Sequence, residues 1–196
     1  SMNECPPRWA NQICRELRCR DEKAAKSMAE LVETTRRSRN SIGSRVDLQI
    51  EGLPLGLGEP WFDGIEPAMA RAMMSIPAAR GVEFGHGFGV QLMHGSDHNS
   101  PWGGTADQPV LMGEQPDGAL AGLSTGAPVH VRVAFKPPSS IPQVQNTLNL
   151  KTNQQEPLVV KGRHDPVLGP RAVAVVEAMA LLVIGDLMVR GGFTDA

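Results

Sequence analysis

The stretch Val129-His130-Val131-Arg132-Val133-Ala134-Phe135 is the clearest strand signal in the chain. Its apolar residues recur at every second position, which is the period of a half-buried strand. It leads directly into Lys136-Pro137-Pro138-Ser139-Ser140-Ile141, where the prolines end the strand and leave a Lys and two Ser on a loop. An ammonium group beside hydroxyl donors suits a phosphate. The sequence therefore predicts a strand whose end carries a candidate anion-binding loop.

A second loop follows about one strand pair later, in Gly162-Arg163-His164-Asp165-Pro166. Its three consecutive ionisable side chains must face solvent, each other or a ligand, because unpaired charges are costly to bury. Arg163 can grip a phosphate with two donors, and Asp165, held between cations, can act as a base. Together with the glycine-rich segment 118–126, the two loops predict a site that binds phosphate and moves a proton. A plain surface turn is the alternative for the second loop.

Composition limits the class of protein. At 196 residues and 21.0 kDa the chain is long enough for one substantial core. The net charge of −2 gives no long-range attraction for a nucleic-acid backbone, and an aromatic content of 4% without tyrosine gives no base-stacking platform. We therefore expect a small, charged ligand, and neither nucleic acid nor a membrane as a partner.

The cysteines are few and lie close to the start of the chain, at Cys5, Cys14 and Cys19. Their number is odd and no Cys-x-x-Cys pair occurs, which fits free thiols in a reducing compartment. The first residues show no secretory-signal pattern. A cytoplasmic location is the resulting expectation.

Hydrophobic periodicity predicts several further elements. They are a helix capped by Asp21, a strand through Val46, Leu48 and Ile50, a helix that starts at Pro67 and stops near Pro77, strands through Val82 to Leu92, and strands around Leu148, Leu150 and 158–160. The stretch 95–118 is rich in Gly, Pro, Asp, Asn and Ser, so we expect it to be irregular and partly mobile.

The apolar stretch 172–189 predicts a long helix that opens at Pro170 and closes at Gly191-Gly192. Its length is close to that of a membrane span, but Glu177, Gly185 and Asp186 interrupt it. The interpretation that we favour is a buried helix of a globular domain.

Three other motifs give no evidence for a cofactor site, a metal site or a catalytic nucleophile. Gly56-Leu57-Gly58 lacks the third glycine of a dinucleotide fingerprint and is interpreted as a turn. His86, His94 and His98 with Asp97 do not have the spacing that places two imidazoles on one helical face, so no metal site is expected. Neither a Gly-x-Ser-x-Gly elbow nor a Cys and His pair supports nucleophilic catalysis.

Seven strings, in one order along the chain from about Cys19 to Arg190, closely resemble the chorismate synthase family. They are Cys19-Arg20-Asp21, Gly56-Leu57-Gly58-Glu59-Pro60, Ala72-Met73-Met74-Ser75-Ile76-Pro77-Ala78, Gly85-His86-Gly87-Phe88, Phe135-Lys136-Pro137-Pro138-Ser139-Ser140-Ile141, Gly162-Arg163-His164-Asp165-Pro166 and Pro170-Arg171-Ala172-Val173. The resemblance covers only the family's carboxy-terminal half, because the amino-terminal half with its Ser-His-Gly motif has no counterpart here.

The resemblance implies an activity and a cofactor. Members of the family convert 5-enolpyruvylshikimate 3-phosphate to chorismate in the shikimate pathway of aromatic amino acid biosynthesis, and they need reduced FMN. Asp165 matches the family's carboxylate near the flavin and would move the proton, with Arg163 available to a phosphate. The implied flavin contacts are Pro77, Ala78, Ala121, Lys136, Pro137, Pro138, Ser139, Ser140 and Arg163.

The resemblance also implies an α+β fold, a β-α-β sandwich of antiparallel sheets with helices packed between them, incomplete relative to the family. We expect residues 1–18 to be an amino-terminal extension, residues 19–196 to form the chorismate synthase-like domain, and the assembly to be a homotetramer. Asp117 and Ala121 stand where the family's glycine-rich stretch has glycines. Their carboxylate and methyl group replace hydrogen atoms there, which calls the close approach of the flavin into question.

Three hypotheses follow for the function. The first is a lyase, a truncated or split chorismate synthase whose missing histidines come from a separate amino-terminal half or a lost upstream segment. The second is a catalytically inactive flavin-binding or scaffold homologue, which the missing half motivates. The third is a phosphate-binding domain unrelated to the shikimate pathway.

Overall fold

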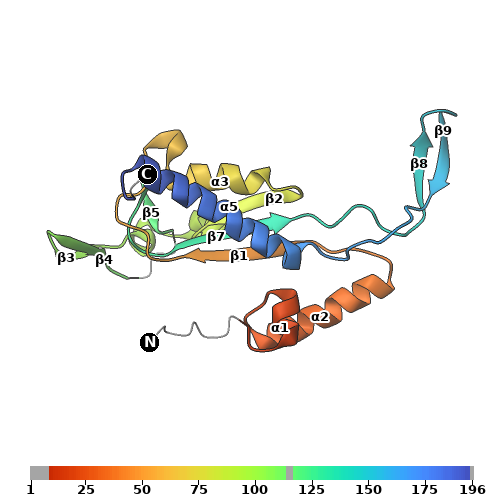
Figure 1. The fold of residues 1–196 in the computed structure, drawn as a ribbon, viewed down its shortest axis with the longest axis horizontal. Coiled ribbons are helices and arrows are strands. Elements are labelled where there is room, and N and C mark those ends of the chain that lie inside the picture. Colours follow the sequence, from red (N-terminus) through yellow and green to blue (C-terminus); the bar gives the residue numbers. More distant parts are fainter. Residues whose placement is uncertain (1–8, 114–116, 195–196) are drawn as a thin grey trace. The chain divides into compact units, whose positions relative to one another are not determined.

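The computed structural model describes residues 9–113 and 117–194, and their contacts divide the chain into two compact units. Unit 1 contains the chain up to Ser44 together with Phe135–Val173. Unit 2 contains Arg45–Ala134 together with the chain from Ala174. Figure 1 shows the helices and strands of both. The division into an extension, residues 1–18, and a domain, residues 19–196, stays a prediction.

Unit 1 begins with two helices, α1 (Gln12–Leu17) and α2 (Glu22–Arg37). The predicted cap of the second helix is confirmed, because the Ala24 N–H donates to Asp21 Oδ1 at 2.7 Å. This bond satisfies one of the amide groups that the first turn of a helix leaves without an intrahelical partner.

The hairpin of β8 (Gln145–Asn149) and β9 (Gln154–Leu158) also belongs to unit 1. Its antiparallel strands confirm the prediction of strands in this part of the chain, although Leu150 lies in the turn between them and Val159 and Val160 follow the end of β9. The Glu156 carboxylate accepts hydrogen bonds from Asn149 Nδ2 at 2.9 Å and from Thr152 Oγ1 at 2.8 Å. These two bonds, the one from Asn149 first, lower the pKa of Glu156.

The central sheet has three strands in the order β1 (Ser44–Ile50), β7 (Val129–Phe135) and β2 (Ala79–Phe84). Figure 1 shows the middle strand β7 running opposite to its two neighbours. The strands predicted at 46–50 and 129–135 are confirmed. Val131 and Val133 of β7 are fully buried, as alternation of apolar residues requires.

Helix α3 (Ile65–Ser75) follows the short 3-10 helix η1 (Trp61–Asp63) and packs against β2. The predicted end near Pro77 is confirmed, but the predicted start at Pro67 is wrong. Proline is tolerated anywhere in the first turn, where amide groups lack intrahelical acceptors, so it marked the start only approximately. The buried core of unit 2 consists of Val46, Ile50, Leu53, Leu57, Ile65, Ala68, Met69, Met73, Ile76, Ala79, Val129, Val131, Val133, Val176, Ala180, Ile184 and Leu187.

The segment after β2 differs from the prediction. Val82 and Phe84 lie in β2, but Phe88, Val90 and Leu92 lie in a 3-10 helix, η2 (Gly87–Leu92), rather than a strand. Gly85 and Gly87 turn the chain there with φ values of 49° and 57°. The stretch expected to be irregular contains α4 (Gly95–His98) and the antiparallel pair β3 (Trp102–Thr105) and β4 (Gln108–Leu111), and its residues 114–116 lie outside the described chain.

A very short antiparallel pair, β5 (Ala119–Leu120) and β6 (Leu123–Ser124), is joined by a two-residue turn. Ala121 and Gly122 in this turn have φ values of 53° and 90°, and positive φ at both central residues is typical of a type I′ turn. The Gly122 carbonyl accepts from the Ile65 N–H at 2.9 Å, so the turn also caps the start of α3.

The last helix, α5 (Gly169–Arg190), confirms the predicted long helix. One face of its unit 2 portion is buried through Val176, Ala180 and Leu187, but Leu181 and Leu182 on the opposite face are 65% and 68% exposed. The expectation of a buried helix is therefore right for one face only. Among the described residues, α5 alone is long and apolar enough to span a membrane, a test that core helices also pass. The predicted α+β class with antiparallel sheets is confirmed.

Candidate functional site

The two loops predicted to form the site both contact one short segment of unit 1, Ser41-Ile42. Ser41 Oγ donates to the Pro138 carbonyl at 2.6 Å. The N–H of the next residue, Ile42, donates to the Pro166 carbonyl at 2.8 Å. Because the two donors belong to consecutive residues, the structure brings the loop after β7 and the loop before α5 close together.

The next residue, Gly43, lets this segment approach the first loop closely. A Cβ on Gly43 would lie 3.1 Å from the Phe135 carbonyl oxygen and 3.6 Å from the Pro137 ring. Gln143 Nε2 adds a further link, donating to the Ser38 carbonyl at 3.0 Å. The position of the loop after β7 is thus fixed from both of its ends.

The polar side chains of the first loop point to solvent. Lys136, Ser139 and Ser140 are exposed, as is Arg163 of the second loop. Neither Lys136 nor Arg163 forms an ion pair with any residue within 9–113 or 117–194. Two cations with open hydrogen-bonding positions therefore lie on adjacent loops, and this is the chemistry that a phosphate group needs.

The Asp165 side chain of the second loop is oriented by an ion pair. Its Oδ2 accepts from Arg171 Nη1 at 2.6 Å, and its side chain is 29% exposed. In the part of the chain that is described, no hydrogen bond reaches Oδ1. The neighbouring His164 ring lies 3.0 Å from the Val160 carbonyl through Nε2. The carboxylate is thus oriented by one oxygen and open at the other.

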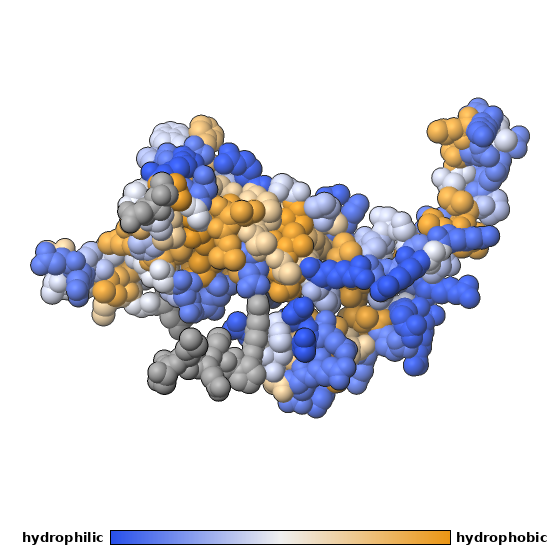
Figure 2. All heavy atoms as spheres, in the orientation of Figure 1, coloured by the Kyte–Doolittle hydropathy of each residue, from blue (hydrophilic) through white to orange (hydrophobic). Residues whose placement is uncertain are grey.

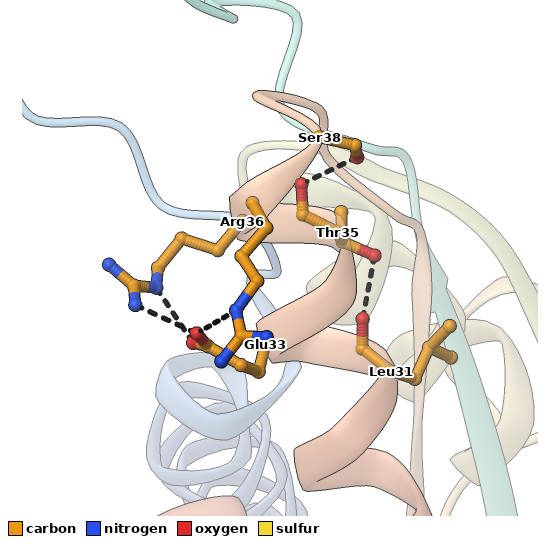
Figure 3. Close-up of polar contacts among 6 residues, drawn as sticks. Leu31, Glu33, Thr35, Arg36 and Ser38 are labelled. Atoms are coloured by element: carbon orange, nitrogen blue, oxygen red, sulfur yellow. Dashed lines mark hydrogen bonds and ion pairs between the residues drawn. The ribbon is translucent and has the colours of Figure 1, made fainter.

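The last turn of α2, which precedes the Ser41 segment, carries two arginines, and both already bind a carboxylate (Figure 3). The Glu33 carboxylate accepts from Arg36 at 2.9 and 3.0 Å and from Arg37 at 2.8 Å. These bonds, the one from Arg36 first, lower the pKa of Glu33 to about 2. Arg36 and Arg37 are therefore less available to an anionic ligand than Lys136 and Arg163.

Three of the predicted flavin contacts, Pro77, Ala78 and Ala121, belong to unit 2. Ala78 lies between α3 and β2 with a φ of 71°, and Ala121 lies in the type I′ turn with a φ of 53°. A left-handed conformation costs an alanine about 1–2 kcal/mol relative to its ordinary regions. The methyl group noted at Ala121 is thus accommodated at some cost to the backbone.

The Asp117 side chain contacts two other residues of unit 2. Its Oδ2 lies 2.8 Å from His98 Nε2, and a Cβ on Gly85 would overlap its carboxylate. Burial, and next the charge of Asp117, raise the pKa of nearby Glu66. Nowhere in the described ranges do three or more His, Cys, Asp or Glu side chains group closely enough to hold a metal ion.

Two residues that shape the site were not singled out from the sequence. Arg171 orients Asp165 from six positions away, across Pro166 and Pro170, where no periodic pattern connects the two residues. Ser41 lies in the stretch Asn40–Ser44, whose composition is that of a turn and predicts no contact. Its contact with Pro138 spans 97 positions, which no local sequence signal reports.

The sequence profile of a family described as "Chorismate synthase" matches residues 7–189. The chain therefore belongs to the chorismate synthase family. It overlays with a TM-score of 0.70 on a solved structure titled "Crystal Structure of Chorismate Synthase", at 25% sequence identity, covering 89% of this chain and 45% of that one.

Curated relatives agree with this assignment. A chorismate synthase of Methanosarcina barkeri is 45% identical over 179 residues, which are 91% of this chain and 49% of the relative. One of Roseiflexus castenholzii is 45% identical over 175 residues, with 89% and 49% covered. The chain thus spans about half the length of the curated relatives it matches.

Proposed function

We propose that this chain supplies the carboxy-terminal half of a chorismate synthase, a lyase that eliminates phosphate and a proton from 5-enolpyruvylshikimate 3-phosphate to give chorismate in the shikimate pathway. The observation that carries the proposal is the pair of hydrogen bonds from Ser41 and Ile42, which join the Lys136 loop to the Arg163-His164-Asp165 loop. The two exposed cations and the oriented carboxylate can then contact one phosphorylated ligand.

The donor set of the two loops fits reduced FMN, the cofactor that the family uses. Lys136 offers a point charge, Arg163 a planar pair of donors, and Ser139 and Ser140 hydroxyl groups, all exposed. Pro137 and Pro138 stiffen the loop that carries them. Pro77, Ala78 and Ala121 are proposed as further flavin contacts. Reduced FMN, when bound, would lend electron density transiently to the reaction.

Asp165 is proposed to accept the proton that the elimination releases. Arg171 holds its Oδ2, which leaves Oδ1 to face the substrate. Arg163 is proposed to stabilise the leaving phosphate, which takes the electron pair of the carbon–oxygen bond and gains negative charge as that bond breaks. In this scheme the substrate loses a proton to Asp165 and a phosphate to solvent, with no net oxidation.

The proposed enzyme needs partners. An amino-terminal half must supply the family's Ser-His-Gly segment, either from the same or from a separate polypeptide. We further propose a homotetramer in the cytoplasm, as for the family, with residues 19–196 as the chorismate synthase-like domain. The small-molecule substrate is the only other partner in the proposal.

A second candidate, a catalytically inactive flavin-binding or scaffold homologue, is favoured by two positions of unit 2. Asp117 pairs with His98, and Ala121 holds a left-handed conformation, where the family's stretch has glycines. Such a protein would keep the phosphate-binding loops and lose turnover.

One anaerobic assay separates the two candidates. The purified chain, reduced FMN and 5-enolpyruvylshikimate 3-phosphate are mixed, and phosphate release is followed with and without the amino-terminal half of the M. barkeri relative. We expect release only with the added half, with the intact M. barkeri enzyme as positive control. If the mixture releases no phosphate while the intact M. barkeri enzyme is active, the result supports the scaffold candidate instead.

Replacing Lys136 by alanine is expected to weaken flavin binding about 10- to 100-fold, because one charge-assisted contact contributes about 1.5–3 kcal/mol. Titration of FMN followed by its fluorescence measures the change. Lys151→Ala is the matched control, since Lys151 is also an exposed lysine but lies in the β8–β9 turn. Equal affinities for the two variants would remove Lys136 from the proposed flavin contacts.

A further inference from the structure

Two cysteines of unit 1, Cys14 and Cys19, are joined by one backbone hydrogen bond at the end of α1. The helix ends at Leu17, and Arg18 after it holds a left-handed conformation, with a φ of 55°. The N–H of the next residue, Cys19, donates to the Cys14 carbonyl at 3.0 Å. A left-handed residue followed by a hydrogen bond of this span is the Schellman motif, which ends many helices.

The motif places the two cysteines close enough for a disulfide. The 3.0 Å hydrogen bond and the standard bond lengths on either side of it keep the two Cα atoms within about 7 Å of each other. The linked atoms do not lie on a straight line, so the separation is shorter than this limit. Disulfide-linked cysteines have Cα atoms about 4.4–6.8 Å apart. Side chains at these two positions of a Schellman motif also commonly pack against each other, so the backbone here is compatible with a bond between the two sulfurs.

The two thiols differ in their access to solvent. Cys14 is the one buried residue of α1, with none of its surface exposed, and Figure 2 shows mostly hydrophilic residues over α1 and α2. Cys19 is half-buried, and its Sγ donates to the Asp21 carbonyl at 3.4 Å. A thiol is a weak donor, so this bond restrains the Cys19 side chain only weakly. Cys19 is therefore the thiol that a dissolved oxidant can reach, and Cys14 is the shielded thiol beside it.

We propose that Cys14 and Cys19 are a modification site, a dithiol that hydrogen peroxide converts reversibly to a disulfide. Peroxide transfers one oxygen atom to the Cys19 sulfur, which becomes a sulfenic acid, and the other oxygen leaves as water. The Cys14 sulfur then attacks the Cys19 sulfur, an S–S bond forms, the S–O bond breaks, and the hydroxyl leaves with the Cys14 proton as a second water. The two thiols thus give two electrons and two protons to one peroxide. A dithiol reductant restores both thiols by exchange.

The disulfide would fix the end of α1, which is a weakly held element. Helix α1 has six residues, fewer than an isolated helix needs to be stable in water. Its start is capped by Asn11 Oδ1, which accepts from the Cys14 N–H at 2.9 Å, and its end is closed by the hydrogen bond from Cys19. A covalent link between residues 14 and 19 would keep that end closed. Oxidation is therefore expected to slow the opening of α1 and to leave the longer α2 unchanged.

The test maps the disulfide in the purified chain. The chain is treated with a small molar excess of hydrogen peroxide, its remaining thiols are blocked with N-ethylmaleimide, and it is digested with trypsin without reductant. Arginines place the three cysteines on separate tryptic peptides, with Cys5 on 1–8, Cys14 on 9–15 and Cys19 on 19–20. We expect mass spectrometry to find peptides 9–15 and 19–20 joined, and dithiothreitol to separate them. Cys5 lies outside the described residues, and Cys5→Ser is expected to form the same link.

Two serine variants separate the roles of the thiols. In Cys14→Ser the oxidation should stop at the sulfenic acid of Cys19, which dimedone captures, and in Cys19→Ser the shielded Cys14 should stay reduced. Hydrogen exchange of the oxidised and reduced Cys5→Ser chain gives a second measurement. We expect the α1 amides to exchange about tenfold more slowly, or slower still, once the disulfide has formed. Neither the mapping nor the exchange uses the Cys14→Ser variant, so both remain decisive if that variant does not fold.

Four outcomes would overturn the proposal. They are thiols that stay reduced, a link that involves Cys5 in place of Cys14 or Cys19, a disulfide between two copies of the chain, and faster exchange of α1 after oxidation. None of these measurements involves flavin or phosphate release. A failure of the proposed function would therefore leave the redox result standing, and the reverse also holds.

Discussion

Replacing Asp165 by asparagine is expected to lower the turnover of the reconstituted enzyme by about 10²- to 10⁴-fold, the usual contribution of a positioned general base. Asparagine keeps the shape of the side chain, and its amide oxygen can still accept from Arg171, which lies 2.6 Å from Oδ2. It cannot take up a proton. Phosphate release in the anaerobic assay gives kcat, and an FMN titration of the same variant should give an unchanged affinity.

Glu156→Gln is the matched control for this prediction. Glu156 is also a carboxylate of unit 1 held by hydrogen bonds, from Asn149 and Thr152, but it lies on the hairpin and not on the two loops. Its turnover should equal that of the unchanged chain. Unaltered turnover of Asp165→Asn, or an equal loss in both variants, would exclude Asp165 as the proton acceptor.

Replacing Gly122 by alanine is expected to have the largest effect on stability. Its φ of 90° is unfavourable for alanine, at about 1–3 kcal/mol. The new Cβ would also overlap the Glu59 carbonyl oxygen and lie 3.3 Å from Gly64 Cα, and this overpacking adds about 1–3 kcal/mol. Since backbone surrounds the position, no flexible side chain can move aside. Urea unfolding followed by circular dichroism measures the loss.

Gly126→Ala separates the two contributions. Gly126 has a similar φ of 80°, but a Cβ built on it meets nothing within 4 Å. This variant should lose only the conformational part, about 1–3 kcal/mol. If both variants lost the same free energy of unfolding, the close contact among Gly58, Gly64 and Gly122 would contribute nothing to the destabilisation.

Regular elements with a strong period were predictable from the sequence. The alternation around Val131 and Val133 gave the central strand, and Asp21 gave the start of α2, because a cap and a period are both local signals. The start of α3 was missed by two residues, since Pro67 is compatible with several positions of a first turn. Where Gly85 and Gly87 interrupt the pattern, apolar alternation continued into a 3-10 helix.

The candidate site was predictable in its residue types but not in its assembly. Charges between Gly162 and Pro166 indicated a shaped loop, and the resemblance to a family indicated what it does. The contacts that join the loops come from Ser41, which lies 97 positions before Pro138, and from Ile42, which lies 124 positions before Pro166. Such pairings depend on the tertiary fold, which the local pattern of a single sequence does not report.

The contact between Glu33 and the two arginines at the end of α2 has a consequence for acid tolerance. A pKa of about 2 in the folded chain lies below the ordinary value of 4.5, so this contact stabilises the fold above pH 4.5 and is lost only as the pH falls toward 2. Mild acidification therefore leaves this ion pair, which joins successive turns of α2, in place.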